Sequence, residues 1–264
     1  MSNKYSLALI DLFEGLKSYR VWLFLSWQEV RRRYRRSILG PFWITISMGV
    51  LLFAMGPLYG KLLNFELSSY FRTLAVGFIL WSFIVTSLND SCNIFVESES
   101  IIKQIKLPYS FYIFKILSRN LIIFLHNSVI IIFVLFLFPS ENGVVYLNLL
   151  IGIFLLLIYL SWISFLFALL ATRYRDVTQL VASFLQVFFF LTPILWPVAL
   201  IKDSERYIVD WNVFYHLIEI VRAPLLGSNP DALTYYYLSF SAFIGIVLSF
   251  IMFAHKRNKI SYWL

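Results

Sequence analysis

Long apolar runs alternate with short polar segments along most of this chain. Six runs are long enough to form a membrane span: residues 41–60, 73–91, 117–138, 146–171, 178–198 and 236–254. The hydrocarbon core of a bilayer, roughly 30 Å thick, takes about 20 residues of apolar helix to cross. The pattern therefore predicts an all-α integral membrane protein with six transmembrane helices.

The residues before the first span show a different pattern. Leu9, Leu12, Phe13 and Leu16 recur at helical spacing, with Asp11, Glu14 and Ser18 on the other side. A run of five arginines follows within residues 31–36. Burying them in hydrocarbon would cost roughly 15 kcal/mol, at about 3 kcal/mol each. We therefore expect residues 1–40 to form a cytoplasmic amphipathic interface helix and a basic segment, and residues 41–264 to form the six-helix domain.

The last polar segment, about residues 199–235, is longer than an ordinary connection between helices. It carries an apolar stripe with a more polar opposite side. This pattern predicts re-entrant or gate helices that dip into the bilayer or cover an opening of the bundle. The stripe consists of Phe214, Leu217, Ile218 and Val221, and His216, Glu219 and Arg222 lie on the other side.

The basic residues follow the alternation of the spans. Seventeen of the 22 lysines and arginines lie in residues 1–40, 93–119, 172–178 and 253–264, and the other five lie in the alternate loops. An excess of lysine and arginine on one side marks the cytoplasmic side. Both termini are therefore expected in the cytoplasm, and the net charge of +8 is assigned to membrane topology and not to nucleic-acid binding.

Patterns typical of catalytic and metal sites are absent from the sequence. Residues 56–62 only approximate a nucleotide-binding loop, with a leucine where the magnesium-binding hydroxyl belongs. The three histidines match no metal-ligand spacing, and the single cysteine, Cys92, excludes an internal disulfide. We expect no catalytic site, no metal and no cofactor on this chain, so a partner must supply any energy for transport.

Four stretches together resemble the ABC-2 type polysaccharide exporters. They are Trp27 to Trp43, which contains Arg35-Arg36-Ser37-Ile38-Leu39-Gly40-Pro41; the loop around 97–108; Tyr174-Arg175-Asp176; and Leu191-Thr192-Pro193-Ile194. The resemblance covers nearly the whole chain in order and spacing. Two departures stand out, because the family often has a basic residue before the acidic one at Gln28-Glu29 and often has Asn-Pro where Asn212-Val213 stands here.

The resemblance implies the membrane subunit of an exporter in the bacterial cytoplasmic (inner) membrane. The subunit would act as a homodimer with two copies of a separate ATPase, which binds the ATP and Mg²⁺. The cargo would be a lipid-linked glycan such as an O-antigen (the polymer of lipopolysaccharide), a capsular polymer or a teichoic acid. The helix around 92–108 would contact the ATPase, and the helices of the last external loop would form a gate.

Site residues are assigned from these expectations. An arginine fork matches phosphate geometry, so Arg35 or Arg36 could bind the carrier's diphosphate, although general anchoring to anionic lipid also explains the arginines. Aromatic faces can hold a sugar polymer weakly, although most aromatic residues must face lipid. The candidates are Tyr34, Arg35, Arg36, Leu39 and Gly40 for the head group; Trp43, Phe53, Tyr59, Phe188, Phe189 and Trp196 for the channel; Glu97, Glu99, Ile101, Ile102 and Lys103 for coupling to the ATPase; and Phe214, Leu217, Ile218 and Val221 for the outer gate.

Two other classes of function stay open on the sequence. A membrane transferase acting on lipid-linked sugars would need a convergent acid and base, for which Asp90, Glu97, Glu99 and Asp176 are available on the inner side. A scaffold without transport activity would not need the long external loop. For coupling, the plainer alternative is that residues 97–103 form a solvated turn, although an exposed isoleucine pair favours a docking surface.

Overall fold

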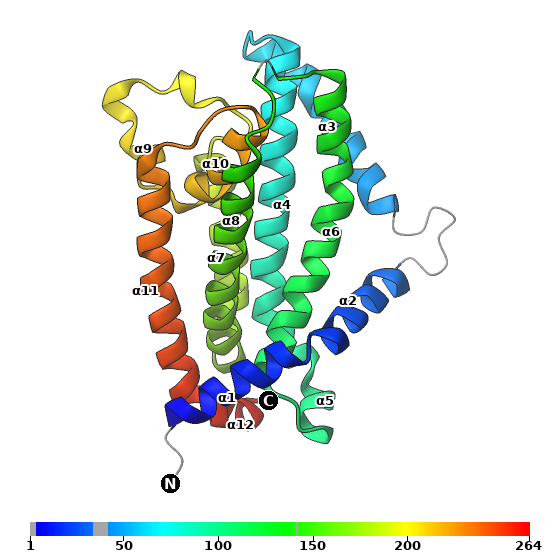
Figure 1. The fold of residues 1–264 in the computed structure, drawn as a ribbon, viewed down its shortest axis with the longest axis vertical. Coiled ribbons are helices and arrows are strands. Elements are labelled where there is room, and N and C mark those ends of the chain that lie inside the picture. The colour runs from blue at the N-terminus through cyan, green and yellow to red at the C-terminus, as the bar shows by residue number, and fades with distance from the viewer. Residues whose placement is uncertain (1–3, 34–41, 141) are drawn as a thin grey trace.

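The computed structural model describes residues 4–33, 42–140 and 142–264, and within these ranges the chain is helical with no β-strand. Long helices form an upright bundle, and shorter helices cover its two ends (Figure 1). The helices are α1 (Lys4–Lys17), α2 (Tyr19–Arg33), α3 (Phe42–Leu62), α4 (Leu67–Glu97), α5 (Glu99–Gln104), α6 (Tyr109–Leu137), α7 (Tyr146–Arg173), α8 (Asp176–Leu191), η1 (Val198–Leu200), η2 (Asp203–Glu205), α9 (Tyr207–Asp210), α10 (Val213–Leu225), α11 (Ala232–Lys256), η3 (Arg257–Lys259) and α12 (Ile260–Trp263).

Five helical stretches of the described residues are long and apolar enough to cross a membrane. They are α3, α4, α6, α7 and the stretch from Ala232 to Trp263. Their number is one below the six spans expected, and the difference lies at residues 178–198. The chain is thus a multi-pass membrane protein, and its described part has five candidate spans of full length.

The expected span 178–198 is wrong in its length, because α8 ends at Leu191 after 16 residues. A proline disfavours helical backbone in the residue before it, and Thr192, which precedes Pro193, is extended with φ −91° and ψ 135°. A helix of 16 residues is about 24 Å long, less than the hydrocarbon thickness. Nevertheless α8 runs from one end of the bundle toward the other, so the helices still alternate in direction (Figure 1).

The two ends of the bundle differ in what covers them. The short helices α1, α2, α5 and α12 gather at one end, called the α5 end below, and α9 and α10 lie at the other, the α10 end (Figure 1). The expected amphipathic N-terminal segment forms two helices, α1 and α2, which lie across the α5 end (Figure 1). Both pack on α6, and α1 also packs on α11.

Helix α4 lies at the centre of the bundle and contacts α3, α6, α7, α8 and α10. Two-thirds (67%) of its most apolar stretch is buried, whereas only 11% of the corresponding stretch of α3 is buried. Because lipid is as apolar as the helices, close packing has to hold such a bundle together. At Gly152 of α7, an added Cβ would lie 2.2 Å from the carbonyl oxygen of Ile220, so the glycine permits the close approach of α7 and α10.

Candidate functional site

Helix α5 is a separate short helix between α4 and α6 in the chain, and it projects from the end of the bundle that carries α1, α2 and α12 (Figure 1). Its apolar side chains do not all face the same way. Ile101 and Ile105 are 42% and 55% exposed, whereas Ile102 is half-buried against the core at this end. The exposed isoleucine pair is therefore Ile101 and Ile105, and not the pair Ile101 and Ile102 expected from the sequence.

The charged residues around α5 face water. Glu97 is exposed at the end of α4, and Lys103 Nζ donates to Glu99 Oε1 across one helical turn at 2.6 Å. This hydrogen bond is the main reason why the pKa of Glu99 is lowered from its ordinary value. An exposed pair of this kind contributes little to stability, so α5 combines two exposed isoleucines with a solvated ion pair.

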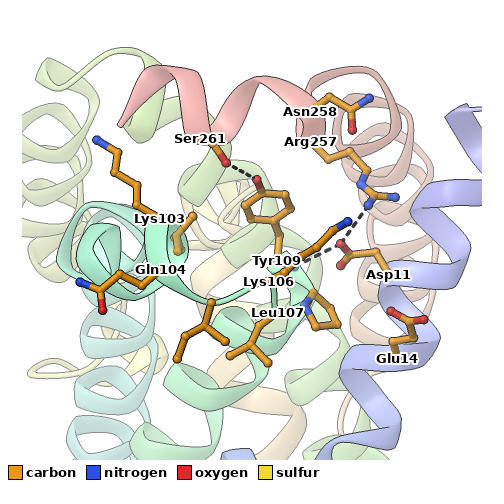
Figure 2. Close-up of a pocket in the computed structure, with 13 residues that line it drawn as sticks. Asp11, Glu14, Lys103, Gln104, Lys106, Leu107, Tyr109, Arg257, Asn258 and Ser261 are labelled. Carbon is orange, nitrogen blue, oxygen red and sulfur yellow. Dashed lines mark hydrogen bonds and ion pairs between the residues drawn. The ribbon is translucent and has the colours of Figure 1, made fainter.

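The polypeptide just after α5 is fixed by a carboxylate from α1 (Figure 2). Asp11 is buried, and its two carboxylate oxygens accept hydrogen bonds from the backbone N–H groups of Tyr109 and Ser110 at 3.1 and 3.0 Å. The first N–H groups of a helix have no partner within the helix, and a negative charge is favoured there. Asp11 thus caps α6 from another helix and joins α1 to the chain that leaves α5.

The C-terminal helices contact the same region. Arg257 of η3 lies 3.5 Å from the Asp11 carboxylate and also donates to the carbonyl oxygen of Leu7. Tyr109 and Ser261 are joined through their hydroxyls at 2.6 Å. Between α1, the segment 102–109 and residues 257–261 lies a cavity of about 670 Å³ (Figure 2). The segment that follows α5 is therefore held by both ends of the chain.

An ion-pair network joins α2, α4 and α6 near the same end. Glu29 accepts from Lys115 Nζ at 2.7 Å and from Arg119 Nη1 at 3.3 Å, and Arg119 Nη2 donates to Asp90 at 2.5 Å. Asn120 Nδ2 also donates to Asp90, at 2.9 Å. The sequence indicated no role in binding for Glu29, Lys115 or Arg119. Ionisable residues within an apolar span usually pair with one another. Asp90 lies in one predicted span and Arg119 in the next, so the sequence could have predicted an ion pair between them.

The candidates for the head-group site cannot be placed. Tyr34, Arg35, Arg36, Leu39 and Gly40 all lie outside the residues that the structure describes. Their assignment stays a prediction, and the described residues closest to them in sequence are Arg33 at the end of α2 and Phe42 at the start of α3.

The candidate channel aromatics fall into two groups by burial. Trp43 and Phe53 of α3 are 51% and 45% exposed, whereas Tyr59 is half-buried against the core. Phe188 and Phe189 are also half-buried; Phe188 packs on Phe214 and Phe189 packs on Phe78 and Trp81. Trp196 lies beyond the end of α8 and donates to the carbonyl oxygen of Phe190 at 3.0 Å.

Of the three consecutive phenylalanines on α8, Phe190 is the exposed one, at 64%. It belongs to an apolar face of α8 that nothing in the described chain covers. Helical periodicity alone could not show which of the three phenylalanines is exposed, because all three are flanked by apolar residues. The exposed face consists of Leu180, Phe184, Val187, Phe190 and Leu191.

The candidate outer-gate residues are all buried in α10. Phe214, Leu217, Ile218 and Val221 are at most 6% exposed and belong to the main core of the bundle. The other side of α10 carries the polar residues, as expected from the sequence, but it is buried as well: His216 is 1% and Arg222 5% exposed. Helix α10 is therefore packed against α4, α7 and α11.

The polar residues of α10 hold the chain that follows α8. Arg222 Nη1 donates to the carbonyl oxygen of Pro193 at 2.8 Å, and the Tyr70 hydroxyl of α4 donates to the carbonyl oxygen of Leu195 at 2.7 Å. Glu219 lies 2.6 Å from Arg222 Nη2 and balances its charge. Non-helical backbone at membrane depth needs such partners, because lipid offers none.

Asn212 completes this arrangement. Its Nδ2 donates to Thr192 Oγ1 at 3.0 Å, and its Oδ1 accepts from the backbone N–H groups of Phe214 and Tyr215, which caps α10. Val213 then occupies the first position of the helix, a position where proline is well tolerated. The departure from Asn-Pro therefore leaves the cap of α10 in place.

The sequence is similar to those of known proteins over most of its length. The family model described as ABC-2 type transporter matches residues 20–226. The O-antigen export system permease protein RfbA of Klebsiella pneumoniae is 26% identical over 241 residues, which cover 89% of this chain and 90% of that protein. The protein of the same name from Myxococcus xanthus is 21% identical over 201 residues, 75% of this chain and 76% of that protein.

Proposed function

Because the chain belongs to the ABC-2 type transporter family, we propose that this membrane permease is the channel-forming subunit of an exporter for a lipid-linked polysaccharide. The family implies a partner ATPase, and this chain would act as a homodimer with two copies of it in the bacterial cytoplasmic membrane. The similarity to O-antigen export permeases over about nine-tenths of the chain supports the choice of cargo. The polymer could equally be capsular or of the teichoic-acid type.

The observation that carries this proposal is the position of α5. It lies at the end of the bundle where α1 and the arginine-rich helix α2 also lie (Figure 1). We assign this end to the cytoplasm because of these arginines. Ile101 and Ile105 provide a small apolar surface next to the charged residues Glu97, Glu99 and Lys103. Such a surface suits a cleft of the ATPase, and movement of α5 would pass to α6 and α1 through the Asp11 cap.

Two helices leave apolar faces for a second copy of the chain or for the polymer. Most of α3 is exposed, and α8 has the uncovered face that contains Phe184 and Phe190. Trp43 and Phe53 lie on the exposed part of α3. In the proposed dimer these faces would line or close the export path.

The transferase alternative has less support. Two of its four possible acids are engaged elsewhere, since Asp90 pairs with Arg119 and Glu99 pairs with Lys103. A carboxylate that is already paired with a cation is not free to act as the acid or base of a transferase.

The coupling role is tested by changing the exposed isoleucines together. We expect Ile101→Asp with Ile105→Asp to lower co-purification of the ATPase at least tenfold, because two charges would have to be buried in its cleft. The melting temperature should stay unchanged, since both side chains face water. Leu200→Asp is the matched control, because Leu200 is 51% exposed and lies between α8 and α10.

Export itself is tested with the purified complex of this chain and its ATPase. Addition of a lipid-linked glycan should stimulate ATP hydrolysis, and the isoleucine variant should lose that stimulation. Normal stimulation in the isoleucine variant would reject α5 as the coupling element, and no stimulation of the wild-type complex by any lipid-linked glycan would reject the cargo.

A further inference from the structure

A groove of about 590 Å³ lies between α7 and α11 and is bounded by α1, which crosses the α5 end (Figure 1). Ten of the twelve described residues that line this α7–α11 groove are apolar. The other two are serines, and Ser161 donates its hydroxyl to a backbone carbonyl oxygen within α7 at 2.7 Å. Among the lining residues Phe165 and Phe253 are buried, whereas Phe154 is 64% and Ile246 45% exposed. The groove is therefore apolar and open to the surroundings of the bundle.

The α7–α11 groove suits a flexible chain better than a helix. A spanning helix is about 10 Å wide and roughly 30 Å long, and α1 lies across its path, since Leu9 and Leu12 line the groove. The volume falls within the range of roughly 300–1,000 Å³ that is usual for small-ligand sites. An unfilled groove would lose van der Waals contact along its wall, and such contact holds helices together in a bilayer. A lipid acyl chain in the groove would therefore stabilise the packing of α1, α7 and α11.

A basic corner adjoins the groove near the start of α1. Phe250 lines the groove, and the centre of its ring lies 6.3 Å from that of Tyr5. Lys4 Nζ lies 5.2 Å from the centre of the Tyr5 ring and within hydrogen-bonding distance of His255 Nε2. The Tyr5 ring also contacts the ring of His255 edge-on, with the centres 5.6 Å apart. Tyr5 thus connects the apolar groove to the ammonium group of Lys4.

This corner carries an excess of positive charge. Residues 4–11 and 250–257 contain Lys4, Lys256 and Arg257 but a single acidic residue, Asp11. Arg257 lies 3.5 Å from the carboxylate of Asp11, so these two charges balance. Neither Lys4 nor Lys256 is paired with a carboxylate among the described residues. Unpaired cations at a membrane surface attract anionic lipid, so the corner complements a negatively charged head group.

We propose that the α7–α11 groove binds one anionic phospholipid, with an acyl chain along Phe165 and Phe253 and the phosphate at Lys4. The lipid would fix α1 against α7 and α11 in addition to the contacts within the protein. With the α5 end in the cytoplasm, the lipid belongs to the cytoplasmic leaflet. The proposal does not depend on the exported cargo, and its test needs neither the ATPase nor a glycan.

The probe is phosphatidylglycerol, which is anionic, compared with phosphatidylcholine that carries the same acyl chains and no net charge. Both lipids are added at equal mole fraction to the full-length protein in detergent, and native mass spectrometry counts the lipids that stay bound to each chain. Phosphatidylglycerol should be retained about fivefold more than phosphatidylcholine, as expected for one lysine beside a phosphate at the membrane surface. Equal retention of the two lipids by the wild-type protein would reject a site for an anionic lipid.

Lys4→Gln tests the position of the head group. It should lower retention of phosphatidylglycerol to the level of phosphatidylcholine and leave phosphatidylcholine unchanged, because only the charge is lost. Lys17→Gln is the matched control, since Lys17 is an exposed lysine at the other end of α1 that does not line the groove. If Lys4→Gln does not fold, His255→Glu replaces it, because a carboxylate beside Lys4 should cancel the same charge. A loss in Lys17→Gln as large as that in Lys4→Gln would indicate general attraction of lipid to basic residues and overturn the proposal.

Ile246→Trp tests the groove itself, because the larger side chain would fill it. Retention of both lipids should fall by about tenfold or more, which is the effect of displacing only two methylene groups of an acyl chain. Val247→Trp is the matched control, since Val247 is 41% exposed on α11 and does not line the groove. Unchanged retention by Ile246→Trp would place the lipid elsewhere and reject the groove as its site.

The same spectra show the oligomeric state, which separates a lipid from a second copy of the chain as the occupant. Ile246→Trp should keep the oligomeric state of the wild-type protein. A variant that falls apart into single chains while it still retains phosphatidylglycerol would show that the groove is an interface between copies, and the proposal would fail. Added phosphatidylglycerol should also raise the melting temperature of the wild-type protein more than that of Ile246→Trp, because a ligand stabilises only the state that binds it; an equal rise in both would contradict the site.

Discussion

His216 is a buried side chain with a hydrogen-bond partner on each ring nitrogen. Its Nε2 lies 2.9 Å from the carbonyl oxygen of Asp210, which can only accept, so Nε2 carries the proton. Its Nδ1 lies 2.9 Å from Thr234 Oγ1 and can accept from that hydroxyl. The neutral imidazole therefore fits the site, and burial lowers the pKa of His216 below the ordinary value of 6.5.

A lowered histidine pKa makes stability depend on pH in a definite direction. Below about pH 6.5 the unfolded chain binds a proton that the folded chain does not, so stability is present above this pH and is lost as the pH falls. We expect the melting temperature of the purified protein to fall between pH 7.5 and pH 5.5, and His216→Gln to reduce that fall. An equal fall in the variant would show that other groups cause it.

At the scale of single elements, the Asp11 cap links α1 to α6 and to the segment after α5. We expect Asp11→Ala to lower the free energy of unfolding by about 2 kcal/mol, at the upper end for loss of a helix cap, because the carboxylate is buried. Glu14→Ala is the control, because Glu14 is an exposed acidic residue of the same helix. Denaturant titration of both variants measures the difference, and similar values for the two would argue against the cap.

The helical elements were predictable from apolar runs, and their ends were not. The runs located α3, α4, α6, α7 and α11 because a bilayer requires about 20 apolar residues. Helix α4 continues beyond the predicted end at residue 91 to Glu97, and α6 begins at Tyr109, before the predicted start at residue 117. In the added part of α6, Lys115 has a partner in Glu29 of α2. At α8, the sequence Thr192-Pro193 stops the helix within an apolar run.

The candidate site was predictable in outline only. The position of α5 between two spans followed from charge and hydropathy. Which isoleucine is covered depends on packing against residues distant in sequence, which the pattern does not show. In the structure Ile105 is exposed, and Ile102 is half-buried. Likewise, helical spacing gave α10 an apolar and a polar side, yet both are buried because Pro193, Thr234 and Asp210 offer hydrogen-bond partners.

At the scale of the whole molecule, the two ends of the bundle should face opposite compartments. The chain has one cysteine, the buried Cys92, which can be replaced by alanine to give a cysteine-free background. On that background we expect Ser228→Cys to react with a membrane-impermeant maleimide in intact spheroplasts, and Ser100→Cys to react only after permeabilisation. Both serines are exposed, Ser228 just after α10 and Ser100 on α5.

Labelling of Ser100→Cys in intact spheroplasts would place α5 outside the cell, where no cytosolic ATPase could contact it. Labelling of both positions only after permeabilisation would contradict the alternating direction of the helices, because α8 would then fail to bring the chain across. The measurement therefore tests the orientation of the bundle and whether α8 brings the chain across the membrane.

The shortness of α8 has a consequence for the surrounding lipid. A helix with too little apolar length for its bilayer creates a hydrophobic mismatch, which lipids relieve by thinning locally. Wherever the uncovered side of α8 meets lipid and not a second copy of the chain, the membrane beside it would be thinner, with the head groups at the α10 end drawn toward Trp196. A lipid tail beside this helix would have a shorter distance to travel between leaflets than one beside the spans of full length.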